Sequence, residues 1–572
     1  MPTSSASKPT GDASKAPKAP KPTGGASKAP KATESAESKP TGGASKAPDM
    51  PSGPLECELN LQPLVKKLKR LTALYNSDPN PSIKSLIAKT LQELLEKHPF
   101  VHTTETTANS VDHSFKVVGF TINMRSFRDW LKTPEGKPYK GIQGTGVDDT
   151  VYLISELLRV YLPRGCHVIT ATNSVTGVET VFRFVGINKF SGLQPGDEDE
   201  ESASSAAAFF VNGQTMANVT EIYVTEKING ENAKLSMIKI DGVLYLIAGS
   251  KTTCSIWPAD EDFFESYPLK EGENPDGEYP STTICKLYSE WFRGLTPEQR
   301  LRFCDEFEKH NSNLTIVAEL NRERAPHIVK NKSTYLTLFT MLGSNGPSID
   351  PKEVFSFFKS IGVTDSDTES VRHVRMRERQ ISSPTELTEL VDKIRQDENS
   401  EGAVLYLFGK NGLVGLAKVK TNWYVLRRSL RELCRNNLFA PLTRGDCKGV
   451  PNLPSRRNKP TEKTWQKTTF DVVVKTAINK ARGKCGDFGV NFIKYLVAEL
   501  AKMLSTELGD QNLSDYIAEQ LSIQFPVETE SVIGEMTPLM TPLMTALKTL
   551  NERFNNAFPQ LVEMFEASKM SS

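Results

Sequence analysis

The first 50 residues contain no Leu, Ile, Val or aromatic residue, so this segment has no side chains with which to build a hydrophobic core. It carries eight Lys against four acidic residues, and the unit KPTGGASKAP occurs twice, starting at Lys21 and Lys39. A segment with nothing to bury cannot offset the entropy that ordering costs. We therefore expect residues 1–54 to form a disordered tail and folded structure to begin near Leu55.

Helical and strand-like patterns follow one another after this tail. Leu and Ile recur at three- and four-residue spacing over residues 58–98, which predicts two amphipathic helices. From about residue 115, short β-branched and aromatic runs such as FKVVGFTI, EIYVTEKI and AVLYLFG predict strands. These patterns favour an α+β domain with antiparallel sheets.

Composition divides the rest of the chain into parts. Residues 55–433 hold the strand patterns and are interrupted at 196–207 by an acidic, Ser/Ala-rich segment that predicts a solvated surface loop. Residues 434–467 form a basic, Pro-containing connector. Residues 468–572 show helical spacing of Leu, Ile and Phe, which predicts an all-α C-terminal domain.

Charge and cysteine usage exclude several classes of protein. Lys and Arg total 70 against 69 for Asp and Glu, which excludes a strongly basic nucleic-acid coat but leaves room for a local basic groove. No run approaches the roughly 18 apolar residues of a membrane helix, and the N-terminus lacks the apolar core of a secretory signal. The eight Cys include no CxxC pair. We expect a monomer in the cytoplasm or nucleus that has no contact with a membrane.

Charged residues follow several predicted strands in the order Lys, Lys, Glu, Glu, Lys-x-Lys. The segments are Thr225-Glu226-Lys227-Ile228-Asn229-Gly230, Ser250-Lys251, Ala318-Glu319-Leu320, Glu401-Gly402 and Lys418-Val419-Lys420. A lone KxxG occurs by chance in many chains, so the functional interpretation depends on the motifs that accompany it. Each strand would present its charged side chain at a common face, in the order that ATP-dependent adenylyl transfer would need.

In these motifs the sequence resembles the covalent nucleotidyltransferase superfamily of RNA ligases, DNA ligases and capping enzymes, over about residues 115–430. It looks most like the RNA ligases, especially the sealing domain of plant and fungal tRNA ligases. Further similar segments are Leu162-Pro163-Arg164-Gly165, Gly186-Ile187-Asn188-Lys189-Phe190, Ser250-Lys251 and His327-Ile328-Val329. The RxDK motif of an OB-fold domain is absent from the sequence, and a helical region follows instead. The resemblance implies a nucleotidyltransferase (adenylation) domain.

The resemblance also implies roles in phosphate chemistry. Lys227 would attack the α-phosphorus of ATP, and nearby cations would favour loss of the ammonium proton. Lys251, Lys418 and Lys420 would neutralise charge on the transferred phosphate. Arg164 offers a planar guanidinium that suits bidentate phosphate contact.

Other residues would hold the nucleotide and a cation. By the same resemblance, Glu226 or its backbone lies at the adenine edge and Glu319 at the ribose hydroxyls. Gly230 would let the backbone turn tightly beside the nucleotide. Glu401 is the candidate contact for Mg²⁺ (or Mn²⁺), because hard cations prefer carboxylate and water oxygens.

A basic stretch follows the Lys-x-Lys motif. Candidate RNA-backbone contacts are Arg427, Arg428, Arg431, Arg456 and Arg457, with a solvated helix face as the alternative. Tyr424, just before them, suits either base stacking or core packing.

Plant and fungal tRNA ligases also carry end-healing modules, and the sequence lacks their motifs. It contains no GxxxxGK[ST], and a single His-x-Thr at His102-Thr103-Thr104. We therefore expect a stand-alone ligase that joins a 5′-phosphate RNA end to a 3′-hydroxyl end, with or without a 2′-phosphate, through lysyl-AMP and RNA-adenylate. The ends would be tRNA halves or broken RNA, in tRNA splicing or RNA repair, prepared by a separate kinase and phosphodiesterase. The alternatives are a DNA ligase or guanylyltransferase of the same superfamily, or a catalytically silent RNA-binding scaffold.

Overall fold

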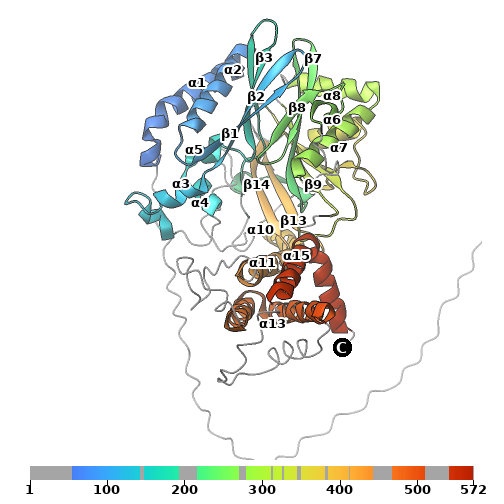
Figure 1. The fold of residues 1–572 in the computed structure, drawn as a ribbon. Helices are drawn as coiled ribbons and strands as arrows, with labels where there is room; N and C mark the ends of the chain where they lie inside the picture. The colour runs from blue at the N-terminus through green and yellow to red at the C-terminus, as the bar shows by residue number, and fades with distance from the viewer. Residues whose placement is uncertain are drawn as a thin grey trace, which may run out of the picture. The chain divides into compact units, whose positions relative to one another are not determined.

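The fold is seen in a computed structural model (Figure 1). It describes residues 54–141, 147–190, 192, 216–268, 279–310, 314–324, 327–343, 349–380, 384–410, 412–441, 467–508 and 540–570. The predicted tail up to residue 53, the acidic segment at 196–207 and residues 442–466 of the predicted connector lie outside the described residues. The described part has three β-sheets with flanking helices and a helical C-terminal region, so the predicted mixture of helices and antiparallel sheets is observed.

The N-terminal part packs helices against a four-stranded antiparallel sheet. The helices before the sheet are η1 (Glu56–Leu61), α1 (Gln62–Ser77) and α2 (Pro81–Glu96). The strands, in sheet order, are β1 (Val101–Asn109), β2 (His113–Ile122), β3 (Cys166–Asn173) and β4 (Glu179–Phe184). Between β2 and β3 lie α3 (Met124–Trp130), η2 (Lys137–Gly141), α4 (Val147–Ile154) and α5 (Glu156–Tyr161). The two N-terminal helices lie where the Leu and Ile spacing predicts them.

The second sheet has six strands and a large aromatic core. Its strands, in sheet order, are β11 (Val371–His373), β10 (Tyr335–Leu342), β9 (Thr315–Asn321), β6 (Glu231–Ile240), β7 (Val243–Gly249) and β8 (Cys254–Pro258). Neighbours pair antiparallel except β10 and β11, which are parallel. The helices of this part are α6 (Phe263–Ser266), α7 (Pro280–Gly294), α8 (Pro297–Lys309) and α9 (Pro351–Ser360). Tyr288, Phe292, Phe303 and Phe358 from these helices are buried against the sheet.

The third sheet has the order β12-β5-β13-β14 and is antiparallel. Its strands are β12 (Met376–Gln380), β5 (Glu221–Glu226), β13 (Gly402–Gly409) and β14 (Gly412–Lys420). The 3₁₀ turn η4 (Met216–Asn218) precedes β5, and α10 (Pro384–Gln396) packs on this sheet through Val391 and Ile394. Tyr223 and Tyr406 share a buried cluster with Val317 of the second sheet. The second and third sheets therefore pack face to face and fix where their strands end.

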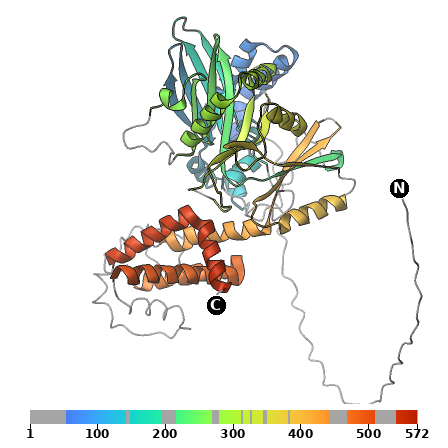
Figure 2. The ribbon, with the colours of Figure 1, turned by 90° about the vertical axis from the view of Figure 1, so that its right-hand side faces the viewer.

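A helical region follows the last strand directly. Its elements are α11 (Asn422–Cys434), η5 (Arg435–Phe439), α13 (Lys467–Leu508) and α15 (Met540–Met570). Leu430, Ile493, Leu496, Leu547 and Phe554 are buried together in one cluster, and α13 and α15 lie side by side in Figure 2. The chain leaves helical geometry at Gly486 and at Ala557, the latter just before a proline that cannot continue the hydrogen-bond ladder. Helical structure continues from α11 into η5, so residues 434–439 of the predicted connector are helical.

Within the residues that the structure describes, no helix is both long enough and apolar enough to cross a bilayer.

Two residues of α8 test the assigned core. Phe303 is fully buried and contacts Trp291, Phe292 and Phe307, whereas Leu301 on the same helix is 61% exposed. Phe303→Ala is expected to lower the free energy of unfolding by about 3–5 kcal/mol, because it removes buried area and leaves a cavity. Leu301→Ala should change it by no more than about 0.5 kcal/mol. Urea denaturation followed by tryptophan fluorescence measures both, and equal effects would contradict this core.

Candidate functional site

Adjacent strands of the third sheet bring the predicted Lys, Glu-Gly and Lys-x-Lys motifs to one place. β5 pairs with β13, and just beyond their last pair the Lys227 N–H donates to the carbonyl oxygen of Gly402 (2.8 Å). On the other side of β13, Lys420 of β14 lies opposite Gly402. Glu401 directly precedes β13. The strand register therefore makes Lys227, Glu401 and Lys420 neighbours although they lie far apart in the sequence.

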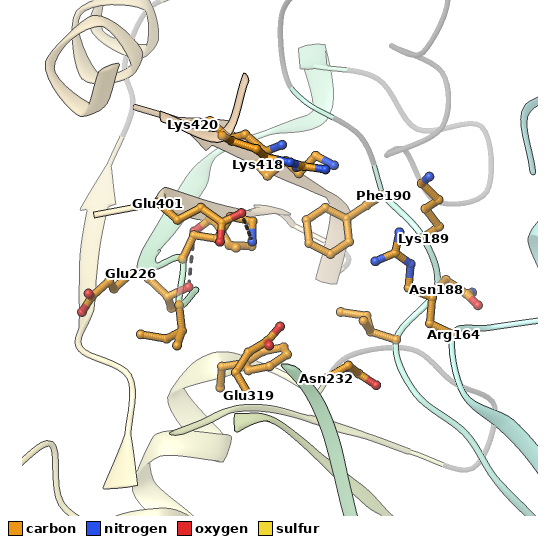
Figure 3. A pocket seen from close by; sticks show the side chains of 17 residues that line it. Arg164, Asn188, Lys189, Phe190, Glu226, Asn232, Glu319, Glu401, Lys418 and Lys420 are labelled. Carbon is orange, nitrogen blue, oxygen red and sulfur yellow. Dashed lines mark hydrogen bonds and ion pairs between the residues drawn. The ribbon is translucent and has the colours of Figure 1, made fainter. Parts of the chain in front are cut away.

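These residues open into a pocket of about 260 Å³ (Figure 3). The predicted ATP-site residues that line it are Arg164, Glu226, Lys227, Glu319, Glu401, Lys418 and Lys420. The other lining residues are Ile187, Asn188, Lys189, Phe190, Thr225, Ile228, Asn232, Phe339, Val404 and Arg428. Strands or loops of all three sheets contribute, together with α11. The pocket thus lies where these parts of the chain meet.

An ion pair between Lys227 and Glu401 lies at the wall of the pocket. The distance from Lys227 Nζ to Glu401 Oε1 is 2.7 Å, and the two side chains are 19% and 7% exposed. The second carboxylate oxygen, Oε2, accepts a hydrogen bond from Nδ2 of Asn229 (3.0 Å). Such a pair is held in one geometry, because separation would leave a charge unpaired in a poorly solvated place. The Lys227 amine is therefore fixed beside the pocket with a carboxylate as its direct partner.

Two hydrogen-bond acceptors from neighbouring strands face the pocket without a protein donor. Glu319 of β9 and Asn232 of β6 lie opposite each other in the antiparallel register. Glu319 Oε2 and Asn232 Oδ1 are buried and have no hydrogen-bond partner among the residues that the structure describes. A buried polar atom left unpaired costs about 1–3 kcal/mol. This pair is therefore suited to a ligand that brings hydrogen-bond donors, such as sugar hydroxyls.

Burial also changes the acidity of Glu319. It raises the pKa of this carboxyl to about 7, Lys227 opposes the rise, and Glu401 adds to it. The physical cause is that a buried carboxylate loses its hydration and gains little in return unless it is hydrogen-bonded. Near neutral pH, Glu319 therefore exists in both protonation states.

A buried lysine that no sequence pattern marks supports the turn that carries Arg164. Lys234 of β6 is fully buried, donates through Nζ to the carbonyl oxygen of Gly165 and lies 4.2 Å from the centre of the Phe184 ring. Burial lowers the pKa of Lys234 to about 8. Gly165 has a φ of +70°, and a Cβ there would lie 2.8 Å from Lys234 Nζ, so glycine is required at this turn. Arg164 is held on this turn at the edge of the pocket.

Two predicted site residues lie elsewhere. Gly230 is not among the described residues that line the pocket, and a Cβ at this position would lie 2.5 Å from the carbonyl oxygen of Leu320, so close approach of a neighbouring strand requires the glycine. Lys251 is exposed in the turn after β7 and is not among the residues that line the pocket. The predicted phosphate contact of Lys251 therefore has no support in this arrangement.

The predicted RNA-binding arginines separate into different environments. Arg427 is 12% exposed and pairs with Glu566 of α15 (2.6 Å), and Arg431 is 16% exposed and donates to the carbonyl oxygen of His327 (3.0 Å). Both thus join elements within the protein, because their helix is covered on that side. Arg428 lines the pocket instead. Arg456 and Arg457 lie outside the described residues.

Two further residues were missed or left open by the sequence. The Asn229 amide donates hydrogen bonds to Glu401 and to the Tyr424 hydroxyl group of the helical region. Tyr424 is buried in the helical core, where its ring is 5.8 Å from Lys420 Nζ, so packing explains its position. Asn229 lies within the KxxG motif, but the sequence does not indicate its role, because its partners are distant in the chain and meet only through the fold.

The carboxylates of the site bear on whether it could hold a divalent cation. In the part of the chain that the structure describes, no group of three or more His, Cys, Asp or Glu residues is arranged to hold a metal ion. Both oxygens of Glu401 already have partners, Lys227 and Asn229. Mg²⁺ commonly takes one or two protein carboxylates and completes its shell with water and substrate phosphate. Because each carboxylate oxygen has two lone pairs, Glu401 can contact a cation of that kind beside its present partners, if a phosphorylated ligand shares the cation.

No known protein family matches the sequence, and no curated protein does. Similar solved structures include the RNA ligase of Naegleria gruberi. A mutant of that ligase with ATP and Mn is 16% identical over 37% of this chain and 53% of that chain, with a TM-score of 0.24.

Other structures of the same ligase compare in the same way. The ligase with PPi is 17% identical over 37% of this chain and 52% of that chain, with a TM-score of 0.24. A mutant with AMP and Mn is 16% identical over 36% and 52%, with a TM-score of 0.22. This chain thus spans about half of the ligase chain, and TM-scores of this size do not establish a common fold. ATP, AMP, Mn and pyrophosphate are ligands of those proteins.

The raised pKa of Glu319 predicts a pH dependence of stability. Between the ordinary value of 4.5 and about 7, the folded chain keeps a proton that the unfolded chain has lost, so stability falls as pH rises through this window. At about 1.4 kcal/mol per pKa unit, the loss is about 3 kcal/mol. Glu319→Gln should abolish it, whereas Glu290→Gln, at an exposed position of α7, should not. Urea unfolding across this pH range measures the effect, and a fall that persists in Glu319→Gln would contradict it.

Proposed function

We propose that this protein is an ATP-dependent RNA ligase that works through a covalent lysyl-AMP intermediate on Lys227. The observation that carries the proposal is the position of the Lys227 amine, 2.7 Å from Glu401 at the wall of a pocket lined by other cationic side chains. An ordinary surface lysine is exposed to solvent, whereas the Lys227 side chain is only 19% exposed and is held by an ion pair. A lysine that attacks a phosphorus atom needs this fixed geometry and these neighbouring charges.

The first step would form one bond and break another. The Lys227 ammonium gives up a proton, for which Glu401 Oε1 is the nearest acceptor, and the neutral amine attacks the α-phosphorus of ATP. A nitrogen–phosphorus bond forms while the bond from that phosphorus to the pyrophosphate oxygen breaks, and the nitrogen then gives up a second proton to water, which leaves a neutral phosphoramidate nitrogen. Arg164, Lys418 and Lys420 would stabilise the charge that spreads over the phosphate oxygens.

The nucleotide would be oriented by the acceptors that lack donors. Glu319 and Asn232 would accept hydrogen bonds from the ribose hydroxyls, and the Glu226 segment would contact adenine. Glu401 would contact Mg²⁺ or Mn²⁺, and such a cation would neutralise part of the charge on the phosphates.

The later steps would use RNA. AMP would pass from Lys227 to the 5′-phosphate of one RNA end, and the 3′-hydroxyl of the other end would then attack and release AMP. Arg428 is the candidate contact for an RNA phosphate, since it reaches the pocket from α11. We further propose a role in tRNA splicing or RNA repair, in the cytoplasm or nucleus, on ends prepared by a separate kinase and phosphodiesterase. A 2′-phosphate beside the 3′-hydroxyl is part of this proposal by resemblance alone.

Covalent labelling tests the first step. The protein incubated with α-labelled ATP and Mg²⁺ should retain an acid-labile label under denaturing conditions, and added pyrophosphate should remove it. Lys227→Ala should lose the label completely, because no amine remains to attack. Lys239→Ala, at an exposed lysine of β6, should label like the wild type. A wild type without label, or a label that Lys227→Ala keeps, would refute the mechanism.

Substrate competition tests the choice of RNA. With ATP, the protein should join RNA strands that carry a 5′-phosphate and a 3′-hydroxyl, and paired substrates with and without a 2′-phosphate report whether that group is required. Preferential sealing of nicked duplex DNA would identify a DNA ligase, and labelling by GTP in place of ATP would identify a guanylyltransferase. RNA binding with no transfer of AMP would identify a silent scaffold.

A further inference from the structure

The side chain of Asn229 joins parts of the chain that are distant in sequence. Its Nδ2 donates to Glu401 Oε2 (3.0 Å) and to the hydroxyl oxygen of Tyr424 (3.2 Å). Its Oδ1 accepts from the backbone N–H groups of Ile328 (2.9 Å) and Val329 (3.0 Å). An amide side chain has two N–H donors and two acceptor lone pairs. Asn229 is 8% exposed and uses its full hydrogen-bonding capacity inside the protein.

On one side, the partners of Asn229 belong to the helical region. Ile328 and Tyr424 are buried in the cluster formed with α11, α13 and α15. Near Ile328, Lys330 pairs with Glu563 of α15 (3.0 Å). The segment 327–330 therefore lies against the helical region, and Asn229 binds that segment and α11 at once.

On its other side, Asn229 is linked to the Lys227 amine through Glu401. Glu401 accepts from Asn229 through Oε2 and from Lys227 through Oε1, so one carboxylate lies between the two side chains. The orientation of that carboxylate decides where the Lys227 amine is held. A carboxylate bound at only one oxygen would be free to rotate about its terminal bond.

We propose that Asn229 is a positioning residue that holds Glu401 against Lys227 and makes this geometry depend on the docked helical region. The inference rests on the proposed function, because it concerns the rate at which Lys227 reacts. Asparagine suits the role because its amide supplies both donors and acceptors. Aspartate would keep the acceptors for Ile328 and Val329 but would place a second carboxylate against Glu401.

The coupling acts in both directions. When Lys227 Nζ bonds to the α-phosphorus and the bond to pyrophosphate breaks, the nitrogen has lost two protons and its positive charge. Once these protons have passed to water, Glu401 Oε1 has no ionic partner, while Oε2 keeps Asn229. Because coupling between two sites is reciprocal, a change at Lys227 alters the hold of Asn229 on the segment 327–330 and on Tyr424.

Full-length variants separate positioning from nucleotide binding. Asn229→Asp should slow covalent labelling at saturating ATP by about 10- to 100-fold, while the ATP concentration for half-maximal rate changes much less. Tyr424→Phe removes only a hydroxyl and should slow labelling in the same sense. In an Asn229→Ala background the Tyr424→Phe change should have no added effect, because both act through one hydrogen bond.

Asn331→Ala is the matched control. Asn331 is also 8% exposed, and its amide bonds to Arg322 and Tyr335 rather than to the pocket. This variant should label like the wild type. Labelling of Asn229→Asp at the wild-type rate, or additive effects of Asn229→Ala and Tyr424→Phe, would overturn the proposal.

Hydrogen exchange tests the positioning role of Asn229 without depending on covalent labelling. Asn229→Ala should raise backbone exchange in the segment 327–330 and in α11 of the full chain, and Asn331→Ala should not raise it in α11. In the wild type, labelling with ATP should change exchange in the same segments. If the wild type takes no label, the proposed function fails, and unchanged exchange in Asn229→Ala would then overturn the positioning role by itself.

Discussion

The ion pair between Lys227 and Glu401 is the interaction on which the arrangement of the site depends. Neither residue belongs to a strand, yet each is fixed by one, because Lys227 follows β5 and Glu401 precedes β13. A shift of that pairing by one residue would turn alternate side chains to the opposite face of the sheet and separate the two charges. The buried clusters beneath the third sheet prevent such a shift, since Tyr223 and Tyr406 have places only in the observed register.

Each sheet supplies a different kind of group to the pocket. The third sheet brings the ion pair and the Lys-x-Lys motif, the second brings the acceptors Glu319 and Asn232, and the loop before β3 brings Arg164. Polar groups left without partners and charges held in place both cost stability, and a protein retains such features mainly where a ligand uses them. The large aromatic core under the second sheet stabilises the fold and offsets these costs. This core lies beside the pocket and not within it.

The sequence predicts the parts of this structure that depend on local pattern. Leu spacing predicts the N-terminal helices, and β-branched runs predict the strands that carry Glu319 and Lys420 and the strand that Lys227 follows, because each pattern reflects a periodicity of the backbone. The environments of single residues are not predictable in this way. Arg427 and Arg431 look like an open basic face, but their partners lie in α15 and at His327. No pattern marks Lys234, and the KxxG motif contains Asn229 without indicating its role, since both roles arise from groups that the fold brings together.

The charges at the pocket explain how a chain with almost no net charge could handle phosphates. Among the residues that the structure describes, six cationic and three acidic side chains line the pocket, a formal excess of three positive charges, while the whole chain carries +1. The excess suits a triphosphate, and in the proposed reaction transfer of AMP to Lys227 replaces an ammonium with an anionic phosphate. The pocket then attracts anions less strongly, which favours release of pyrophosphate. The cations that remain, Arg428 among them, can still hold a single 5′-phosphate, so one set of charges would serve both substrates in turn.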